Sequence, residues 1–214
     1  VFVMRFVSLL LLLAVVAMSG CVENNSSKVS IETGQRSALL LRDVKVEMDY
    51  LLYLPDSYGS DDKAWPLMVF LHGAGERGSN LDLVKVHGPA KLSETDGDLP
   101  FIIVSPQCPS GKWWPDFSFE VMALIDDTVE KYNVDEYRIY LTGLSMGGYG
   151  TWSIACTYPD RFAAIVPICG GGQPYVARNL KAMQVWAFRG AKANVVPVRE
   201  SQKMDEAGKR AGGE

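Results

Sequence analysis

The stretch Arg138-Ile-Tyr-Leu-Thr-Gly-Leu-Ser-Met-Gly-Gly-Tyr-Gly-Thr-Trp152 decides the fold. It opens with a short β-branched and aromatic run, turns through Gly-Leu-Ser-Met-Gly, and continues into residues 149–158, whose composition favours a helix. This order predicts a strand, a sharp elbow and a helix. Ser145 lies at the apex, where we expect a strained backbone conformation. Gly143 and Gly147 flank it because side chains there would collide across so sharp a turn.

A serine at such an elbow is typical of a nucleophile. Its hydroxyl is exposed above the strand ends, and the N–H of Met146 faces the position where a substrate carbonyl oxygen would gain charge. The pentapeptide alone also occurs in ordinary structural turns. The strand before it, the helix after it and a second glycine-rich turn upstream favour Ser145 as a nucleophile over a structural turn.

The second glycine-rich turn follows the continuous apolar run at residues 67–71. That run has the length and composition of a strand buried on both faces. The turn itself, His72-Gly-Ala-Gly-Glu-Arg-Gly78, can bring backbone N–H groups close to an oxyanion. A phosphate-binding loop is the competing interpretation. It fails because the Gly-Lys-Ser/Thr ending and the G-x-G-x-x-G spacing are absent.

Strand-like and helix-like segments alternate along the rest of the chain. Residues 38–54 suit a pair of antiparallel strands at a sheet edge, closed by a turn at 55–59. Because strand alternates with helix, the sequence predicts a mostly parallel sheet covered on both faces, an α/β domain. The other expected strands are 101–104, 163–168 and 185–188, and the expected helices are 81–92 with a break at 88–89, 116–132 and 199–210.

The first twenty residues have the features of an export signal. Arg5 supplies a positive charge, residues 6–18 are almost all apolar, and small residues precede Cys21. This resembles a lipoprotein signal peptide, cleaved before a cysteine whose thiol carries lipid. A retained transmembrane anchor is the alternative, but the run is shorter than the ~20 residues that span a bilayer. We expect an exported protein anchored by lipid to a membrane of the cell envelope, with a signal peptide at 1–20, a polar tether at 21–37 and a domain at 38–214.

Composition argues against two classes of partner. The 214 residues carry a formal net charge of -4, and the basic residues are scattered, so a nucleic-acid surface is not expected. The cysteines of the domain are Cys108, Cys156 and Cys169. They form no Cys-x-x-Cys or Cys/His cluster, so no metal site is expected. Export permits at most one disulfide among three thiols, and small apolar core residues are the favoured interpretation.

Two aromatic residues stand in the loop after the expected strand at 101–104. Trp113 and Trp114 could form a wall for a substrate, or they could pack beneath the loop. The sequence favours neither interpretation.

With these strings, residues 38–214 resemble the α/β-hydrolase superfamily. The similarity is to exported esterases close to polyhydroxybutyrate depolymerases, feruloyl esterases and prolyl-oligopeptidase-like proteins. It rests on the two glycine-rich turns and on three further strings, Ser105-Pro-Gln-Cys-Pro109, Tyr158-Pro-Asp-Arg-Phe-Ala163 and Pro167-Ile-Cys-Gly-Gly-Gly172.

The resemblance implies a serine carboxylic-ester hydrolase that acts on a small ester through an acyl-enzyme, without a metal or organic cofactor. Ser145 would be the nucleophile, and the backbone N–H groups of Ala74 and Met146 would form the oxyanion hole. A serine peptidase or thioesterase of the same fold is the alternative, because the same serine chemistry serves amides and thioesters.

The resemblance also implies a carboxylate and then a histidine base after the serine in chain order. The chain has only His72 and His87, and both precede Ser145. His72 lies in the glycine-rich turn, where it would support the loop. Ala193 stands where the acid is expected, and the adjacent Asn194 cannot carry the charge that stabilises an imidazolium. Neither the triad histidine nor the triad acid is found.

Three interpretations remain open. In the favoured one the chain lacks its C-terminal part, namely the last strand, the histidine loop and the last helix. This truncated chain would be inactive or impaired and would expose a sheet edge and an apolar face. In the second, the protein is a non-catalytic binding pseudo-hydrolase, which Ala193 supports. In the third, His72 or His87 acts as an unusual base.

Overall fold

The computed structural model describes residues 44–95, 98–190 and 196–212. The expected signal peptide, Cys21, the tether and the first residues of the domain lie outside these ranges, as does Ala193. Within the described ranges, no helix combines the length and the apolar character needed to cross a membrane.

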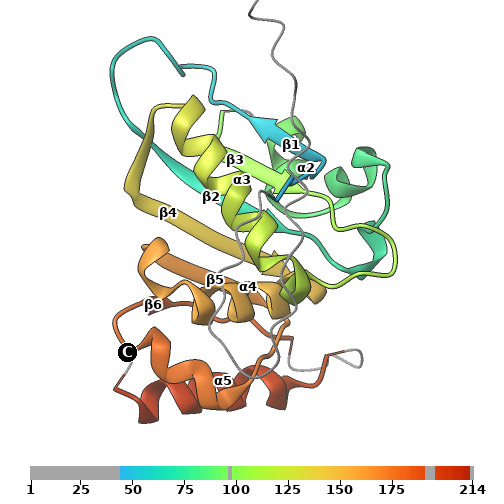
Figure 1. The fold of residues 1–214 in the computed structure, drawn as a ribbon, viewed down its shortest axis with the longest axis vertical. Coiled ribbons are helices and arrows are strands. Elements are labelled where there is room, and N and C mark those ends of the chain that lie inside the picture. Colours follow the sequence, from blue (N-terminus) through green and yellow to red (C-terminus); the bar gives the residue numbers. More distant parts are fainter. Residues whose placement is uncertain (1–43, 96–97, 191–195, 213–214) are drawn as a thin grey trace, which may run out of the picture. The chain divides into compact units, whose positions relative to one another are not determined.

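Six strands in the described part of the chain form one sheet in the order β1-β3-β2-β4-β5-β6 (Figure 1). β1 runs antiparallel to β3, and the other neighbouring pairs are parallel. The mostly parallel sheet expected from the sequence is therefore confirmed. The strands are β1 (Tyr50–Tyr53), β2 (Trp65–Leu71), β3 (Ile102–Pro106), β4 (Val134–Leu144), β5 (Ala164–Ile168) and β6 (Gln184–Val185).

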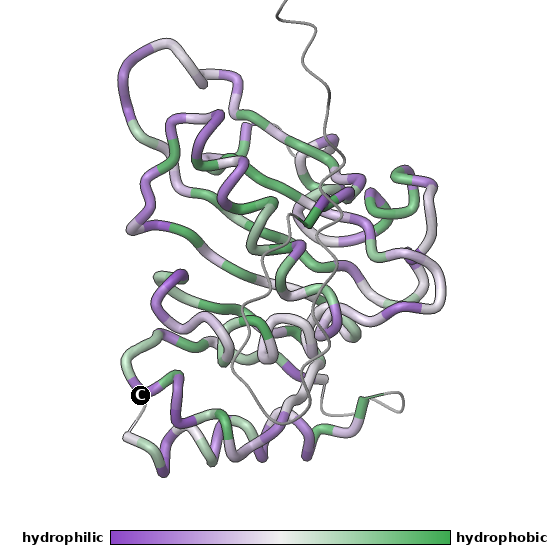
Figure 2. Tube along the Cα trace, in the orientation of Figure 1, coloured by the Kyte–Doolittle hydropathy of each residue, from purple (hydrophilic) through white to green (hydrophobic). Residues whose placement is uncertain are grey.

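The central strands are apolar on both faces, as the continuous runs in the sequence predict. Every residue of β3 is buried, and Met68 is the one residue of β2 that is partly exposed. Side chains alternate between the two faces of a strand. Leu67, Val69 and Leu71 therefore enter the main core, and Met68 and Phe70 point to the opposite face. Figure 2 shows that hydrophobic residues follow the strands, whereas the connection from β1 to β2 is mainly hydrophilic.

Helices cover the two faces of the sheet unequally. α3 (Ser118–Lys131) and α4 (Met146–Thr157) pack on the main core, and α5 (Val198–Arg210) adds Met204 to it. α2 (Gly88–Thr95) borders the opposite face. The 3-10 turns are η2 (Ala74–Glu76), η3 (Leu81–Val86), η4 (Trp114–Phe117), η5 (Pro159–Arg161) and η6 (Pro174–Leu180).

The predicted antiparallel pair at residues 38–54 is wrong for the part that the structure describes. Residues 44–49 are not in a strand, and β1 pairs with β3 instead of with a preceding segment. The physical reason is that β3 offers a free edge with fully apolar side chains, against which Tyr50–Tyr53 completes the sheet.

The other expected elements are confirmed with shifted ends. The break within residues 81–92 occurs at Gly88, which has φ +65° and stands so close to the ring of Phe70 that a Cβ would overlap it. The helix after the elbow begins at Met146, three residues earlier than the composition indicates. The last expected strand, 185–188, is shorter in the structure. β6 pairs with β5 at Gln184 and Val185, and beyond them a single parallel bridge joins Ile168 to Phe188.

Candidate active site

Ser145 connects β4 to α4 in the strained conformation that the sequence predicts. Its φ is 57° and its ψ is -112°, a region that non-glycine residues rarely adopt. The N–H of Ser145 donates to the carbonyl of Ile168 at 2.8 Å, and its own carbonyl accepts the N–H of Tyr149 at 3.1 Å. These two bonds hold the peptide groups on both sides of the strained residue.

The two flanking glycines are required by close backbone contacts. A Cβ on Gly147 would overlap the carbonyl oxygen of Leu71, at the end of β2. A Cβ on Gly143 would overlap the backbone of Gly147 and lie 2.8 Å from the same Leu71 oxygen. The elbow is thus pressed against the strand that leads into the second glycine-rich turn. The steric reason given for these glycines from the sequence is confirmed.

The two glycine-rich turns meet at Gly73. A Cβ built on Gly73 would lie 3.8 Å from Ser145 Cβ and 3.6 Å from the carbonyl oxygen of Leu144. The next residue, Ala74, begins η2, and its N–H has no hydrogen-bond acceptor among the described residues. Met146 begins α4, where the first N–H groups have no partner within a helix. The structure therefore places Gly73, the residue before Ala74, next to Ser145, and Met146 follows the serine directly.

His72 is locked into the loop and is not available to the serine. Its side chain is 1% exposed, Nε2 accepts the N–H of Cys108 at 2.9 Å, and Nδ1 lies 2.6 Å from the carbonyl oxygen of Gly73. Because Nε2 is an acceptor, Nδ1 carries the proton and donates it to Gly73. Burial lowers the pKa of His72, which favours this neutral ring. The supporting role expected for His72 is confirmed, and the interpretation of His72 as a base is wrong.

His72 also sets the direction of a peptide group next to the serine. The carbonyl of Gly73 belongs to the same peptide plane as the N–H of Ala74, and the two groups point in opposite directions across that plane. Holding the carbonyl against the imidazole therefore directs the N–H of Ala74 away from the ring.

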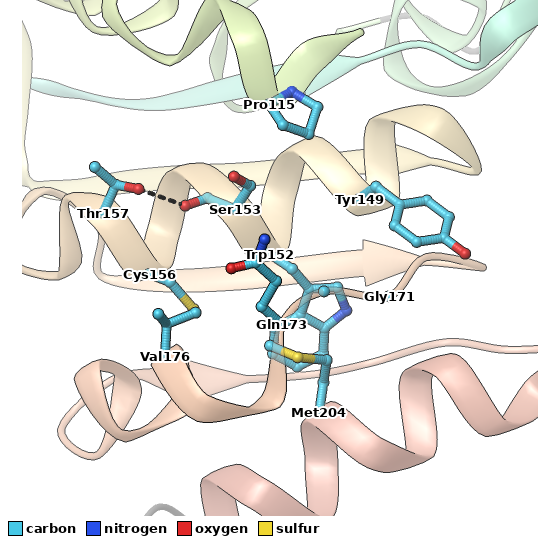
Figure 3. A pocket seen from close by; sticks show the side chains of 11 residues that line it. Pro115, Tyr149, Trp152, Ser153, Cys156, Thr157, Gly171, Gln173, Val176 and Met204 are labelled. Atoms are coloured by element: carbon cyan, nitrogen blue, oxygen red, sulfur yellow. Dashed lines mark hydrogen bonds between the residues drawn. The ribbon is translucent and has the colours of Figure 1, made fainter.

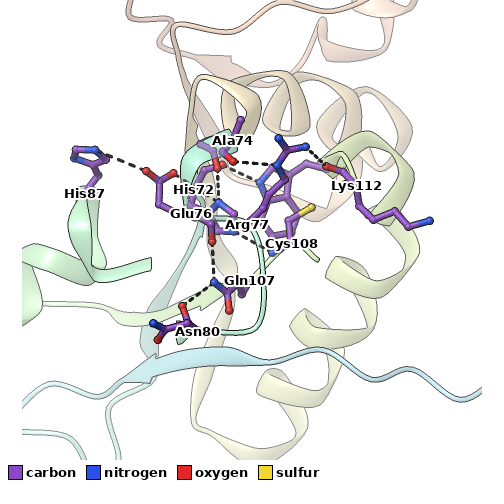
Figure 4. A network of polar contacts seen from close by, with 11 residues as sticks. His72, Ala74, Glu76, Arg77, Asn80, His87, Gln107, Cys108 and Lys112 are labelled. Carbon is purple, nitrogen blue, oxygen red and sulfur yellow. Dashed lines mark hydrogen bonds and ion pairs between the residues drawn. The ribbon is translucent and has the colours of Figure 1, made fainter. Parts of the chain in front are cut away.

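Hydrogen bonds from the side chains of Arg77 and Gln107 hold η2 in place (Figure 4). Arg77 Nε donates to the carbonyl of Ala74 at 3.0 Å, and its Nη1 donates to Lys112 at 3.1 Å. Gln107 Nε2 donates to the carbonyls of Glu76 and Asn80, both at 2.8 Å. Sequence reasoning quoted both side chains within motif strings but assigned no role to them, because their acceptors lie up to 35 residues away in the chain.

Glu76 is a mostly buried carboxylate between two histidines. Its side chain is 13% exposed, and Oε2 makes no hydrogen bond within the described residues. Oε2 lies 3.8 Å from His72 Nδ1, and Oε1 lies 3.8 Å from His87 Nε2. Both distances exceed those of hydrogen bonds. Sequence reasoning missed Glu76, although it stands in the same turn as Ala74.

The two tryptophans have different environments. Trp114 is fully buried, donates its Nε1–H to the carbonyl of His72 at 2.9 Å, and contacts the imidazole edge-on. Trp113 is 48% exposed and lies edge-on to Tyr149, 6.4 Å between ring centroids. Trp114 therefore packs beneath the loop, and Trp113 alone stays accessible beside α4.

The three cysteines of the domain are free thiols. Cys108 and Cys156 are buried, and burial raises the pKa of each thiol to about 11. Their predicted role as apolar core residues is confirmed. Cys169 is partly exposed and has φ 51°. Within the described residues, no group of His, Cys, Asp and Glu side chains could hold a metal ion.

Two cavities approach the elbow, one on each face of the sheet. The first, about 380 Å³, lies along α4 and is bordered by residues of η6 and α5 (Figure 3). Tyr149, Trp152 and Met204 are among its lining residues. The second, about 620 Å³, lies on the opposite face, between the sheet and α2. It is mainly apolar, and His87 and Leu144 are both part of its wall.

Comparison with known proteins identifies the family. The family model described as "Putative esterase" matches residues 42–202. Poly(3-hydroxyalkanoate) depolymerase C of Paucimonas lemoignei is 31% identical over 125 residues, which are 51% of this chain and 28% of that protein. Acetylxylan esterase A of Emericella nidulans is 34% identical over 94 residues, 38% of this chain and 30% of that protein.

A solved structure supports the same relationship. The crystal structure of a thermostable esterase matches with a TM-score of 0.68 and 35% identity, over 78% of this chain and 49% of that chain. The chain thus spans less than a third of the two curated relatives and about half of the crystallised esterase. The mostly parallel sheet and the esterase neighbours confirm the expected fold. The chain belongs to the esterase family and has the α/β-hydrolase fold.

Proposed function

We propose that this protein is a serine carboxylic-ester hydrolase with Ser145 as the nucleophile. The observation that carries the proposal is the strained elbow, with φ 57° at Ser145, packed against a second glycine-rich turn. Strain at a non-glycine residue persists where the surrounding contacts hold it, and it is concentrated at functional sites. Membership of the esterase family supports the same chemistry.

In the proposed reaction, Ser145 Oγ attacks the carbonyl carbon of an ester as its O–H bond breaks, and the proton goes to the departing alcohol oxygen. The electron pair of the carbonyl bond moves to its oxygen, which the N–H groups of Ala74 and Met146 stabilise as an oxyanion hole. Collapse of this intermediate breaks the ester C–O bond, expels the alcohol and leaves an acyl-enzyme. Water then hydrolyses the acyl-enzyme to the acid, and a proton of the water returns to Ser145 Oγ. His72 contributes indirectly, because its bond to Gly73 directs the N–H of Ala74.

The substrate we propose is a small carboxylic ester. The two relatives are named for a polyhydroxyalkanoate and for acetylated xylan, both of which are esters. The acetyl group is the smaller of the two acyl groups. We also propose that the protein is exported and anchored to a membrane by lipid on Cys21, as the sequence indicates.

The first test is labelling with a fluorophosphonate probe, which reacts with activated serines. We expect covalent labelling of the full chain and hydrolysis of 4-nitrophenyl acetate, and we expect Ser145→Ala to abolish both. Ser145 is partly exposed, and its hydrogen bonds at the elbow are made by backbone groups. The variant therefore removes one oxygen and leaves these backbone contacts in position.

Folding must be controlled in the same experiment. Ser153→Ala is the matched control, because Ser153 lies further along α4 and outside the elbow. We expect the probe to label this variant to the same extent as the parent protein. A folded protein that neither labels nor hydrolyses the ester would contradict the proposal and favour the binding pseudo-hydrolase.

A further inference from the structure

We propose that the 380 Å³ cavity along α4 binds an extended, uncharged carbon chain of the ester that Ser145 attacks. The inference rests on the proposed function, because it names the part of the substrate that lies beyond the reacting ester group. One wall of the cavity follows a single face of α4 from Tyr149 to Thr157 (Figure 3). Eight residues of helix are about 12 Å long, so the cavity is suited to a chain that lies along the helix.

The wall of this cavity is mainly apolar. Trp152, Val176 and Met204 contribute to it, and no charged side chain is among the described residues that line it. The hydroxyl of Thr157 donates to a carbonyl of its own helix at 2.8 Å. A charged group that entered would lose its hydration without gaining a partner of opposite charge. The cavity therefore favours an uncharged hydrocarbon chain.

The helical wall begins one turn after the serine. The N–H of Tyr149 donates to the carbonyl of Ser145 at 3.1 Å, and Tyr149 is itself a wall residue. A long side chain on a helix leans toward the N-terminus and covers the turn before its own Cα. The ring of Tyr149 therefore extends from the cavity back toward the elbow. In Figure 3 it points away from Thr157, which lies at the other end of the wall.

The opposite wall also starts at the elbow. The carbonyl of Ile168 accepts the N–H of Ser145 at 2.8 Å, and the wall residues Gly171 and Gly172 follow shortly after Ile168 in the chain. A Cβ on Gly171 would lie 3.2 Å from the ring of Tyr149. Because both residues are glycines, no side chain from this segment narrows the space beside that ring.

Trp113 adds apolar surface next to the same ring. It is 48% exposed and lies edge-on to Tyr149, with 6.4 Å between the ring centroids. It also stands two residues before Pro115, which lines the cavity. A chain that leaves the ester group along Tyr149 therefore has an aromatic surface beside it before it enters the cavity.

The distance from the serine determines which chains reach the cavity. The four residues from Ser145 to Tyr149 correspond to a rise of about 6 Å along a helix. With carbon–carbon bonds of about 1.5 Å, a chain needs roughly five carbon atoms to cover this distance. An acetyl group is too short to enter, whereas an octanoyl group extends into the cavity by roughly three carbon atoms. Each buried methylene strengthens binding roughly fourfold, so these three contribute roughly 50-fold.

The experiment compares two series of esters with the full chain. The first lengthens the acid, from 4-nitrophenyl acetate to 4-nitrophenyl octanoate, and the second lengthens the alcohol, from ethyl acetate to octyl acetate. In one series we expect kcat/KM of the long ester to exceed that of the short ester by roughly 50-fold, mainly through a lower KM. The series that shows the gain identifies the side of the ester on which the chain lies.

Val176→Trp tests the cavity directly. Val176 is a partly buried wall residue on η6, so an indole at this position occupies space that the chain needs. We expect the ratio of the two kcat/KM values, long ester over short ester, to fall by roughly 10-fold or more. Because both esters are measured on the same sample, a smaller folded fraction leaves this ratio unchanged.

Two control variants carry the same new side chain. Val44→Trp places it at a position that is 70% exposed, and Leu92→Trp places it in the wall of the 620 Å³ cavity on the opposite face of the sheet. Both should keep the ratio of the parent protein. A ratio that is unchanged in Val176→Trp, or lost in Leu92→Trp instead, overturns the inference and leaves Ser145 as the proposed nucleophile.

A measurement without hydrolysis separates this inference from the proposed function. We expect 1-octanol to raise the melting temperature of the parent protein and of Leu92→Trp relative to ethanol at the same concentration, and to leave that of Val176→Trp unchanged. If the parent protein shows this shift but hydrolyses neither series, the proposed function fails and the cavity still binds the chain. Absence of the shift in the parent protein overturns the assignment of the cavity.

Discussion

At the scale of single residues, His72 shows how a titratable side chain can be structural. Its neutral ring both donates and accepts a hydrogen bond, and the acceptor bond from Cys108 requires a nitrogen without a proton. Protonation at Nε2 would turn that attraction into a repulsion between two N–H groups. The geometry of the turn therefore depends on the charge of this buried ring.

This dependence predicts a loss of stability in acid. Burial lowers the pKa of His72 below its ordinary value of 6.5, and unfolding returns the ring to water. Below about pH 6.5 the unfolded chain binds more protons than the folded one, so the free energy of unfolding falls as the pH falls. Above the unfolded-state pKa the contribution is fully present.

Urea unfolding at about pH 8 and about pH 5.5 measures this effect. His72→Gln removes the titration, so we expect the difference in unfolding free energy between the two pH values to be smaller in the variant than in the parent. Titration of the carboxylates contributes equally to the pH dependence of unfolding in the parent and in the variant. Equal pH dependences would show that His72 is not the source.

At the scale of elements, the elbow is a contact between the end of one strand and the start of one helix. β2 ends at Leu71, and its carbonyl oxygen occupies the space that a side chain at Gly143 or Gly147 would need. The strain at Ser145 is maintained by this packing, not by the pentapeptide alone.

Gly147→Ala tests this contact. Its Cβ would overlap the carbonyl of Leu71, and neither partner is a flexible side chain, so α4 or β2 must shift. We expect the free energy of unfolding to fall by roughly 1–3 kcal/mol, as for other overpacked sites, and labelling of Ser145 to be lost. Chemical denaturation and the fluorophosphonate assay measure the two effects.

Gly208 provides the matched control, because it lies in α5 with nothing within 4 Å of its Cβ position. Gly208→Ala should leave labelling unchanged and raise stability by roughly 0.5–1 kcal/mol, since alanine favours a helix interior. An unfolding free energy for Gly147→Ala equal to that of the parent would contradict the steric argument.

At the scale of the whole molecule, the described domain and the N-terminal sequence make separate contributions. The sheet, the elbow and the cavities belong to residues 44–212, and the proposed lipid site at Cys21 lies outside the described residues. Attachment to a membrane would therefore depend on the N-terminal segment, and the proposed ester hydrolysis would depend on the domain.

Metabolic labelling with a radioactive fatty acid tests the lipid site. We expect incorporation into the full chain expressed in a bacterium, and we expect Cys21→Ala to abolish it. Cys169→Ala is the matched control, because Cys169 is the partly exposed thiol of the domain. A full chain that stays with the membrane fraction but incorporates no fatty acid would favour the retained transmembrane anchor.

Local patterns predicted the elements that form the site. A strand, a serine between glycines and a helix lie next to one another in the chain, so steric rules that act over a few residues determine Ser145 and its neighbours. The same holds for β2 and its glycine-rich turn. Local patterns could not predict the partner of β1, because β3 begins about fifty residues later in the chain. The two strands pair because β3 has a free edge in the folded sheet.

The sequence by itself determined the α/β alternation, the elbow at Ser145 and the need for glycine on both sides of it. These follow from apolar periodicity and from backbone contacts within one turn. The tertiary structure alone decided that His72 is locked by Cys108, 36 residues away, and that Glu76 lies between Gly73 and His87. Hydrogen-bond geometry and burial depend on which segments meet in space, and spacing along the chain does not carry that information.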